Sequence, residues 1–111
     1  LLPGRVRSIK GDVKLPHIGW NRSKVAKESP LGAEGDEEYY YFVHSFVAEP
    51  EDPADVVATT AYGEEFPSVV VRDNVWGTQF HPEKSGAAGL KLIRAFVQQV
   101  EAAAAGAEAT R

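Results

Sequence analysis

The sequence contains no cysteine, and this absence excludes several kinds of chemistry. A chain without cysteine has no disulfide framework, no thiolate zinc site and no thiol nucleophile. No apolar run approaches the roughly 18 residues that a membrane-spanning helix needs, so we expect no association with a membrane. No secretory signal is visible, and we expect a cytoplasmic protein whose 43% hydrophobic residues form one modest core.

Basic residues are missing from the middle of the chain. Residues 1–27 carry seven Lys or Arg against one Asp, whereas residues 28–65 carry eleven acids and no base, and the formal net charge is −4. The bases of the first third are spread between apolar residues, and no nucleic-acid-binding motif accompanies them. We therefore expect two solvated surfaces, either of which is available to a partner, and no nucleic-acid ligand.

Alternating and helical patterns predict a chain of strands followed by one helix. Gly, Pro, Asn and Asp separate the strands, and a polar loop is expected over Asn21–Glu38. The predicted strands are Val6–Ile9, His17–Trp20, Tyr39–Ala48, Val56–Tyr62, Ser68–Arg72 and Val75–Phe80, and the predicted helix is Gly86–Ala105. Residues 102–111 are alanine-rich and are expected to fray.

Two of these elements carry predictions about burial. The segment Tyr39–Ala48 has apolar residues on both faces, which predicts a strand at the centre of its sheet. In the helix, apolar residues recur at helical spacing and predict the face that packs on the sheet; they are Leu90, Ile93, Phe96, Val97 and Val100. Ser85 precedes this helix and is a candidate N-cap.

The segment from Gly77 to Gly86 carries the most chemical information, because His81 and Glu83 stand two residues apart between a strand and a helix. Residues at this spacing share a side of an extended backbone, and Pro82 fixes the turn between them. The carboxylate can then hold one ring nitrogen of His81 and leave the other free to take a proton from a nucleophile. Alternatively, His-Pro ends the strand and Glu83 stabilises the N-terminus of the helix.

The pentapeptide Gln79–Glu83 resembles the end of the catalytic triad of class I glutamine amidotransferases. The following Lys84-Ser85-Gly86, with Gly89-Leu90, resembles more narrowly the glutaminase subunit of imidazole glycerol phosphate synthase. Further stretches resemble the same subunit in the same order; they are Leu15–Asn21, Tyr41–Phe46 and Ala61–Gly63 with Phe66 and Val69.

This resemblance implies an α/β fold of the class I amidotransferase type, a mixed sheet flanked by helices, of which residues 1–111 form the C-terminal part of a single domain. The oxyanion glycines and the Gly-x-Cys-x-Gly nucleophile of that family lie in its N-terminal half, which is absent here. The resemblance implies hydrolysis of glutamine by a Cys-His-Glu triad, with ammonia passing to a (β/α)8-barrel synthase subunit in a heterodimer. It implies no metal and no organic cofactor.

The resemblance also assigns roles to single residues. His81 and Glu83 are the expected catalytic residues, and Ser45 and Phe46 are expected to bind glutamine through backbone groups. The expected interface with the synthase subunit consists of Pro16, His17, Ile18, Trp20, Tyr41 and Lys84.

Several alternatives remain open at this point. His44 is expected to be a core histidine bonded to backbone, Trp20 could be an ordinary core aromatic, and Lys84 could be a solvated charge. The three histidines lack a companion ligand at metal spacing, which argues against zinc. The chain could instead belong to another class I amidotransferase, or be a non-catalytic interaction module that keeps only the docking face.

Overall fold

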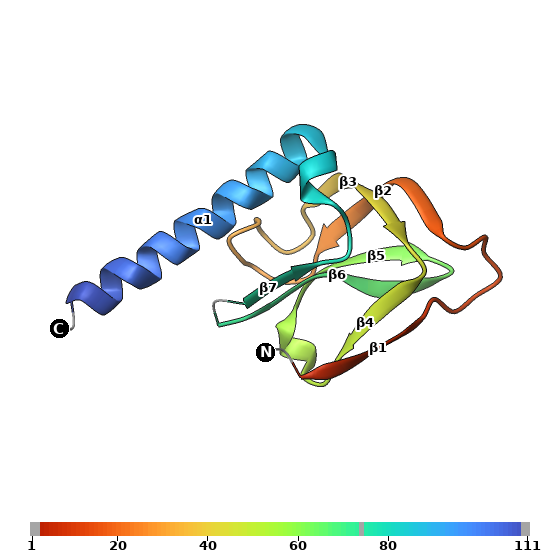
Figure 1. The fold of residues 1–111 in the computed structure, drawn as a ribbon, viewed down its shortest axis with the longest axis horizontal. Coiled ribbons are helices and arrows are strands. Elements are labelled where there is room, and N and C mark those ends of the chain that lie inside the picture. The colour runs from red at the N-terminus through yellow and green to blue at the C-terminus, as the bar shows by residue number, and fades with distance from the viewer. Residues whose placement is uncertain (1–2, 74, 110–111) are drawn as a thin grey trace.

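The computed structural model describes residues 3–73 and 75–109 (Figure 1), and it describes side chains as far as residue 102. Seven strands precede one long helix. In chain order the elements are β1 Gly4–Ser8, β2 His17–Val25, β3 Glu37–His44, β4 Phe46–Pro50, the 3-10 turn η1 Pro53–Asp55, β5 Val56–Tyr62, β6 Glu64–Arg72, β7 Val75–Thr78, the 3-10 turn η2 Pro82–Lys84 and α1 Gly86–Ala109. Within these residues, no helix is both long enough and apolar enough to cross a membrane.

The strands form one sheet of five and one ribbon of two. The larger sheet has the order β3-β2-β5-β6-β7, and the ribbon joins β1 to β4; every pair is antiparallel. Short connections explain the antiparallel order, since β5 and β6 are joined at Gly63 alone. Gly63 has φ 73°, and a Cβ there would lie 2.4 Å from the carbonyl oxygen of Lys10, so the turn requires glycine. The expected α/β combination of sheet and C-terminal helix is confirmed.

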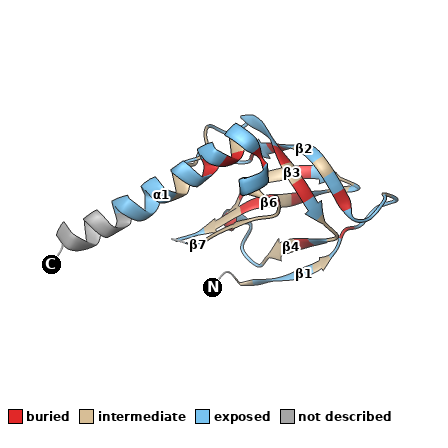
Figure 2. Ribbon diagram, turned by 45° about the horizontal axis from the view of Figure 1, so that its top comes forward, coloured by how far each residue is buried: buried red, intermediate tan, exposed pale blue. Residues whose placement is uncertain are grey.

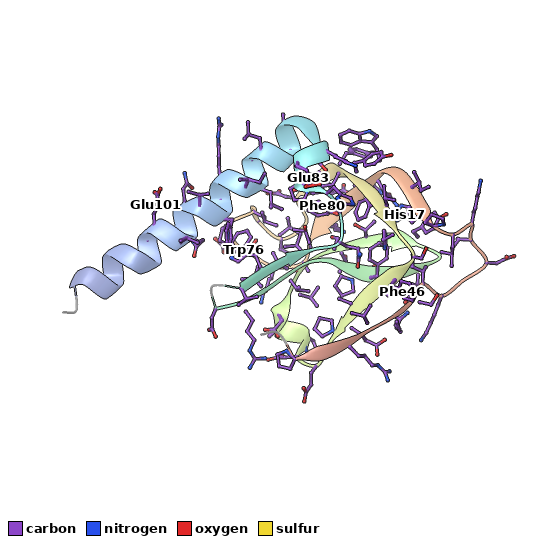
Figure 3. The ribbon with its side chains drawn as sticks, viewed as in Figure 1. His17, Phe46, Trp76, Phe80, Glu83 and Glu101 are labelled. Carbon is purple, nitrogen blue, oxygen red and sulfur yellow. The ribbon has the colours of Figure 1, made fainter. Side chains whose placement is uncertain are left out.

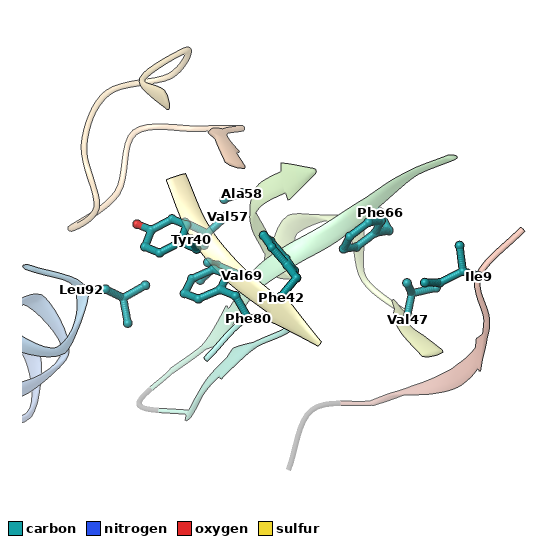
Figure 4. Close-up of a cluster of buried hydrophobic side chains, with 10 residues drawn as sticks. All are labelled: Ile9, Tyr40, Phe42, Val47, Val57, Ala58, Phe66, Val69, Phe80 and Leu92. Atoms are coloured by element: carbon teal, nitrogen blue, oxygen red, sulfur yellow. The ribbon is translucent and has the colours of Figure 1, made fainter. Parts of the chain in front are cut away.

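The core lies where the sheet, the ribbon and the first turns of α1 meet (Figure 4). At one end Tyr40 stacks on Phe80 with ring centroids 3.8 Å apart, and Leu92 of α1 lies in the same buried cluster. At the other end Val47 of β4 and Ile9 join the cluster. Figure 2 shows buried positions on the strands and at the start of α1, whereas the outer part of the described helix is exposed.

The prediction of one continuous strand over Tyr39–Ala48 is wrong. The strand breaks at Ser45, whose carbonyl accepts a hydrogen bond from the N–H of Ile9, and the chain then pairs with β1 instead of β2. The break also shifts the alternation by one residue: Phe42 is buried before it and Val47 after it, with Phe46 exposed. Burial on alternate residues is continuous only while a strand stays in one sheet.

Within the described residues, the prediction that this segment is central is also wrong, because β3 is an edge strand. Its odd-numbered face carries Tyr39 and Val43, and both side chains are exposed. An apolar residue indicates a central strand only if something covers it, and in the described residues nothing covers this face.

Strand β2 extends further than predicted, to Val25, into the segment expected to be a loop. Ser23 and Val25 are buried while Arg22 and Lys24 are exposed, so the polar residues occupy the outer face of a regular strand. The actual loop covers only residues 26–36.

Helix α1 begins at Gly86 as predicted and continues to Ala109, so residues 102–109 are helical; residues 110 and 111 lie outside the described residues. Its packed face differs from the predicted one. Leu92 is buried and Phe96 lies edge-on to Trp76 at 5.4 Å, but Leu90, Ile93, Val97 and Val100 are exposed. Sequence spacing identified the segment as helical, but it did not reveal that the side carrying Leu92 and Phe96 packs while the rest of the predicted stripe is exposed.

Candidate functional site

The side chains of His81 and Glu83 are in contact on the molecular surface. Nδ1 of His81 lies 2.8 Å from Oε1 of Glu83, and within the described part of the chain Nε2 makes no hydrogen bond. The geometry differs in one respect from the expectation of a purely extended segment. His81 is extended, with φ −98° and ψ 99°, but Pro82 opens the 3-10 turn η2 in which Glu83 lies. The ring therefore presents one free nitrogen beside a carboxylate, as the spacing predicted.

Electrostatics favour a charged carboxylate at this position. The pKa of Glu83 is lowered, first by its own backbone N–H and then by the bond to His81 and the charge of Lys84. An ionised Glu83 can orient His81 and stabilise its protonated form. Figure 3 shows Glu83 at the end of the sheet where α1 begins.

The loop that carries this pair is tied to strand β3 at Tyr41. The N–H of His81 donates to the carbonyl of Tyr41 at 2.9 Å, and the hydroxyl of Ser85 accepts the N–H of Tyr41 at 2.9 Å. Ser85 therefore does not use its side chain as a helix N-cap, in contrast to the expectation; its hydroxyl donates instead to the carbonyl of His81 at 2.6 Å. Sequence patterns gave no signal for this bridge, because it joins residues 44 positions apart.

Ser45 and Phe46 lie at the break between β3 and β4, with Phe46 58% exposed (Figure 3). Strand β3 leads from Tyr41, beside His81, to Ser45, a path of about 13 Å at the usual rise of an extended chain. The expected catalytic and glutamine-binding residues are thus held by one strand at two separate positions along it.

An exposed apolar surface lies on β2 and β3, and we call it the aromatic face; it consists of Ile18, Trp20, Tyr39, Tyr41 and Val43. Trp20 is 56% exposed, pairs with Tyr41 in register and contacts its ring edge-on at 5.9 Å. The structure therefore places Trp20 on the surface and not in the core. Pro16 and Lys84, the remaining exposed members of the expected interface, lie just before β2 and at the end of η2.

His17 is placed differently from the other expected interface residues, because its side chain is buried and only 4% exposed. The ring stacks on Phe42 at 4.9 Å and on Tyr62 at 3.9 Å. Strand alternation explains this position: Ile18 and Trp20 point to the aromatic face, so His17 points to the interior.

His17 and His44 form a hydrogen-bonded pair with fixed proton positions. Nδ1 of His44 lies 2.9 Å from the carbonyl of Phe46, which only accepts, so this nitrogen carries the proton. Neutral His44 then accepts at Nε2 from Nδ1 of His17, 2.9 Å away, and Nε2 of His17 accepts from the amide of Asn21 at 3.2 Å. Burial lowers the pKa of His17 to about 4, with a further contribution from His44, and burial also lowers that of His44. The backbone bond expected for His44 is present.

A cavity of about 170 Å³ lies away from this site, between the loop 26–36, the strands and α1. Tyr40 lines it together with Leu31 and Leu92, and burial raises the pKa of Tyr40 to about 12 with a contribution from Glu38. His81 and Glu83 do not line this cavity, so it is not a substrate pocket for the pair. Within the described residues, no three potential metal ligands converge.

Comparison with known proteins identifies the family. Residues 6–100 match the family model described as glutamine amidotransferase class-I. Over 99 residues the chain is 58% identical to "Imidazole glycerol phosphate synthase subunit HisH" of Halobacterium salinarum, an alignment that covers 87% of this chain and 45% of the relative. Over 100 residues each, the proteins of the same name are 54% identical in Natronomonas pharaonis, covering 87% and 46%, and 50% identical in Methanocaldococcus jannaschii, covering 88% and 50%.

The chain thus spans about half the length of the curated relatives it matches. The matched region contains the His81–Glu83 pair, the loop that joins it to β3, and the aromatic face. From the family match and these identities, the chain belongs to the class I glutamine amidotransferase family.

Proposed function

We propose that residues 1–111 are the C-terminal part of a single glutamine amidotransferase domain and supply the histidine and glutamate of a Cys-His-Glu triad. The observation that carries this proposal is the 2.8 Å contact between His81 and Glu83, which leaves Nε2 free. Coverage of about half of each relative supports a partial domain. The edge of β3 away from Tyr41 also supports it, because an unpaired edge is suited to packing against further structure.

In the complete domain, His81 moves the proton while a cysteine from the preceding half supplies the nucleophile. Nε2 accepts the thiol proton, the thiolate attacks the side-chain amide carbon of glutamine, and the C–N bond breaks as His81 returns the proton to the leaving amine. Ammonia leaves and a glutamyl thioester remains, which water hydrolyses to glutamate. Glu83 holds the ring orientation and stabilises the charged imidazolium. This chemistry uses no metal and no organic cofactor on this subunit.

The names of the relatives support a part in imidazole glycerol phosphate synthase, and the finer assignment follows the resemblance of the sequence to its glutaminase subunit. We propose that the ammonia passes to a (β/α)8-barrel synthase subunit that forms imidazole glycerol phosphate and an aminoimidazole carboxamide ribotide in histidine biosynthesis, within a cytoplasmic heterodimer. The proposed contacts with that subunit are Trp20, Ile18, Tyr41, Pro16 and Lys84. The ring of His17 is buried and packs beneath β2 instead of contacting the subunit. Backbone groups of Ser45 and Phe46 are the proposed glutamine contacts.

The test is carried out on the complete amidotransferase subunit paired with its synthase. We expect His81→Ala to lower glutamine-dependent synthesis by several orders of magnitude and Glu83→Gln by less, since the second variant keeps the base. Synthesis from added ammonium salt is the control and should survive both changes. Equal loss of the ammonium-driven reaction would show a folding defect instead of a catalytic role.

A second candidate is a non-catalytic docking module, favoured by the absence of cysteine together with the exposed aromatic face. The 111 residues alone are expected to release no ammonia from glutamine under either proposal. The DNA immediately upstream distinguishes the two proposals. An in-frame Gly-x-Cys-x-Gly segment there favours the enzyme, and a start codon at this point favours the module. Turnover by the isolated 111 residues that disappears in His81→Ala would contradict both.

A further inference from the structure

We propose that Ser85 is a positioning residue for His81, and that its hydroxyl fastens the catalytic loop to Tyr41, a residue of β3 whose side chain belongs to the aromatic face. This inference rests on the proposed function, because it assigns Ser85 a part in the same reaction.

The geometry of three hydrogen bonds supports the proposal. The hydroxyl of Ser85 donates its single proton to the carbonyl of His81 at 2.6 Å and accepts the N–H of Tyr41 at 2.9 Å. The N–H of His81 donates in turn to the carbonyl of Tyr41 at 2.9 Å. His81 is therefore held at both of its backbone polar groups, directly at the N–H and, at the carbonyl, by the hydroxyl of Ser85 together with the N–H of Lys84 at 3.1 Å.

Tyr41 joins this loop to the aromatic face. In an antiparallel strand the N–H and carbonyl of one residue point to the same side, and those of Tyr41 both point away from β2 to the open edge of the sheet. The loop occupies the edge at this point as a neighbouring strand would. The side chain of Tyr41 lies on the aromatic face against Trp20. A protein that docks on this face would therefore contact the residue whose backbone holds His81.

The side chain of Ser85 is closely packed. It is only 1% exposed. Helix α1 presses on the same loop at Gly89, where an added Cβ would lie 1.8 Å from the carbonyl oxygen of Pro82 and 3.0 Å from Cβ of Ser85. Removal of the hydroxyl would leave the N–H of Tyr41 and the carbonyl of His81 without this partner, and we expect the loop to shift as these two groups find others.

Such a shift moves the base relative to the nucleophile and the leaving amine. Proton transfer requires heavy-atom separations near those of a hydrogen bond, and misplacement by about 1 Å can lower a rate by about a hundredfold. Loss of the hydroxyl should thus reduce kcat, while binding of glutamine, assigned to the distant Ser45 and Phe46, changes little.

The experiment uses the complete subunit with its synthase and measures kcat and KM for glutamine. We expect Ser85→Ala to lower kcat about tenfold or more with KM changed by less than about twofold. Ser85→Thr and Ser85→Val form a second pair of nearly equal shape that differs in the hydroxyl, and Thr should be the more active by a similar factor. This pair separates the hydrogen bonds from any effect of packing.

The matched control is Ser68→Ala. Ser68 is likewise 1% exposed, but its hydroxyl has no hydrogen-bond partner within the described residues, and its backbone carbonyl, which accepts from Gln79, is unchanged by the substitution. We expect normal kcat in this variant, and normal synthesis from ammonium salt in every variant.

Each contrary outcome has a distinct meaning. A wild-type complex that makes no ammonia from glutamine overturns the proposed function and this inference with it. An active wild type with Ser85→Ala within twofold of its kcat, or with Thr and Val equally active, overturns the inference alone. A rise in KM at unchanged kcat also overturns it, because Ser85 would then act on glutamine binding.

Discussion

Acid should destabilise the fold through protonation of His17. The hydrogen bonds around the ring explain why the free energy of unfolding falls and does not rise. Both nitrogens of neutral His17 are already committed, one donating to His44 and one accepting from Asn21. Protonation would turn Nε2 into a donor facing the Asn21 amide. The other groups packed on the ring offer no compensating charge: Tyr62 stacks on it from β5, and Phe66 of β6 is apolar.

The magnitude follows from the difference between the two pKa values. The pKa of His17 falls from 6.5 to about 4 on folding, chiefly through burial. Because the folded-state value is the lower one, the stabilisation is complete above pH 6.5, declines as the pH falls, and is fully lost below about pH 4. Linkage gives a loss of about 2 kcal/mol between pH 7.5 and pH 5, with a limit of about 3 kcal/mol at lower pH.

The assay is urea unfolding of the complete amidotransferase domain at a series of pH values, comparing wild type with His17→Gln. The variant lacks an ionisable group at this position, so its free energy of unfolding should fall less between pH 7.5 and pH 5, by about 2 kcal/mol. Equal pH dependence of the two proteins would refute the argument, because His17 would then titrate alike in the folded and unfolded states.

Three further predictions concern the surface and the loop. Trp20→Ala in the complete subunit should weaken association with the synthase by about 2 kcal/mol, measured by calorimetry. Lys84→Ala should weaken association less, but it should raise the ratio of glutamine consumed to product formed. Unchanged affinity and an unchanged ratio in folded variants would remove both residues from the interface. Gly89→Ala should lower the midpoint of thermal unfolding, because the new Cβ would overlap the carbonyl of Pro82 at 1.8 Å, and a normal midpoint would contradict the close approach of α1. The isolated 111 residues should aggregate through the aromatic face and the open edge of β3, and a monodisperse monomer that unfolds cooperatively would favour the independent module.

Sequence alone determined the features that depend on nearby residues. The contact of His81 with Glu83 was predictable because only Pro82 separates them and its ring restricts the backbone. Strand β5 was predicted with its observed limits, Val56–Tyr62, and the start of α1 at Gly86 was also correct. The family was identifiable for the same reason, since its motifs are short contiguous segments.

Tertiary structure decided everything that depends on which surfaces meet. The apolar residues of Tyr39–Ala48 did not reveal that β3 is an edge strand or that the chain changes partner at Ser45, because pairing with β1 is set by contacts far away in sequence. The same limit applies to α1, where Leu92 is buried and the predicted stripe is largely exposed. Ser85 shows the limit most clearly: beside a helix start it has the pattern of a cap, but its hydroxyl bonds to Tyr41, 44 residues away, because the loop closes the edge of β3 there.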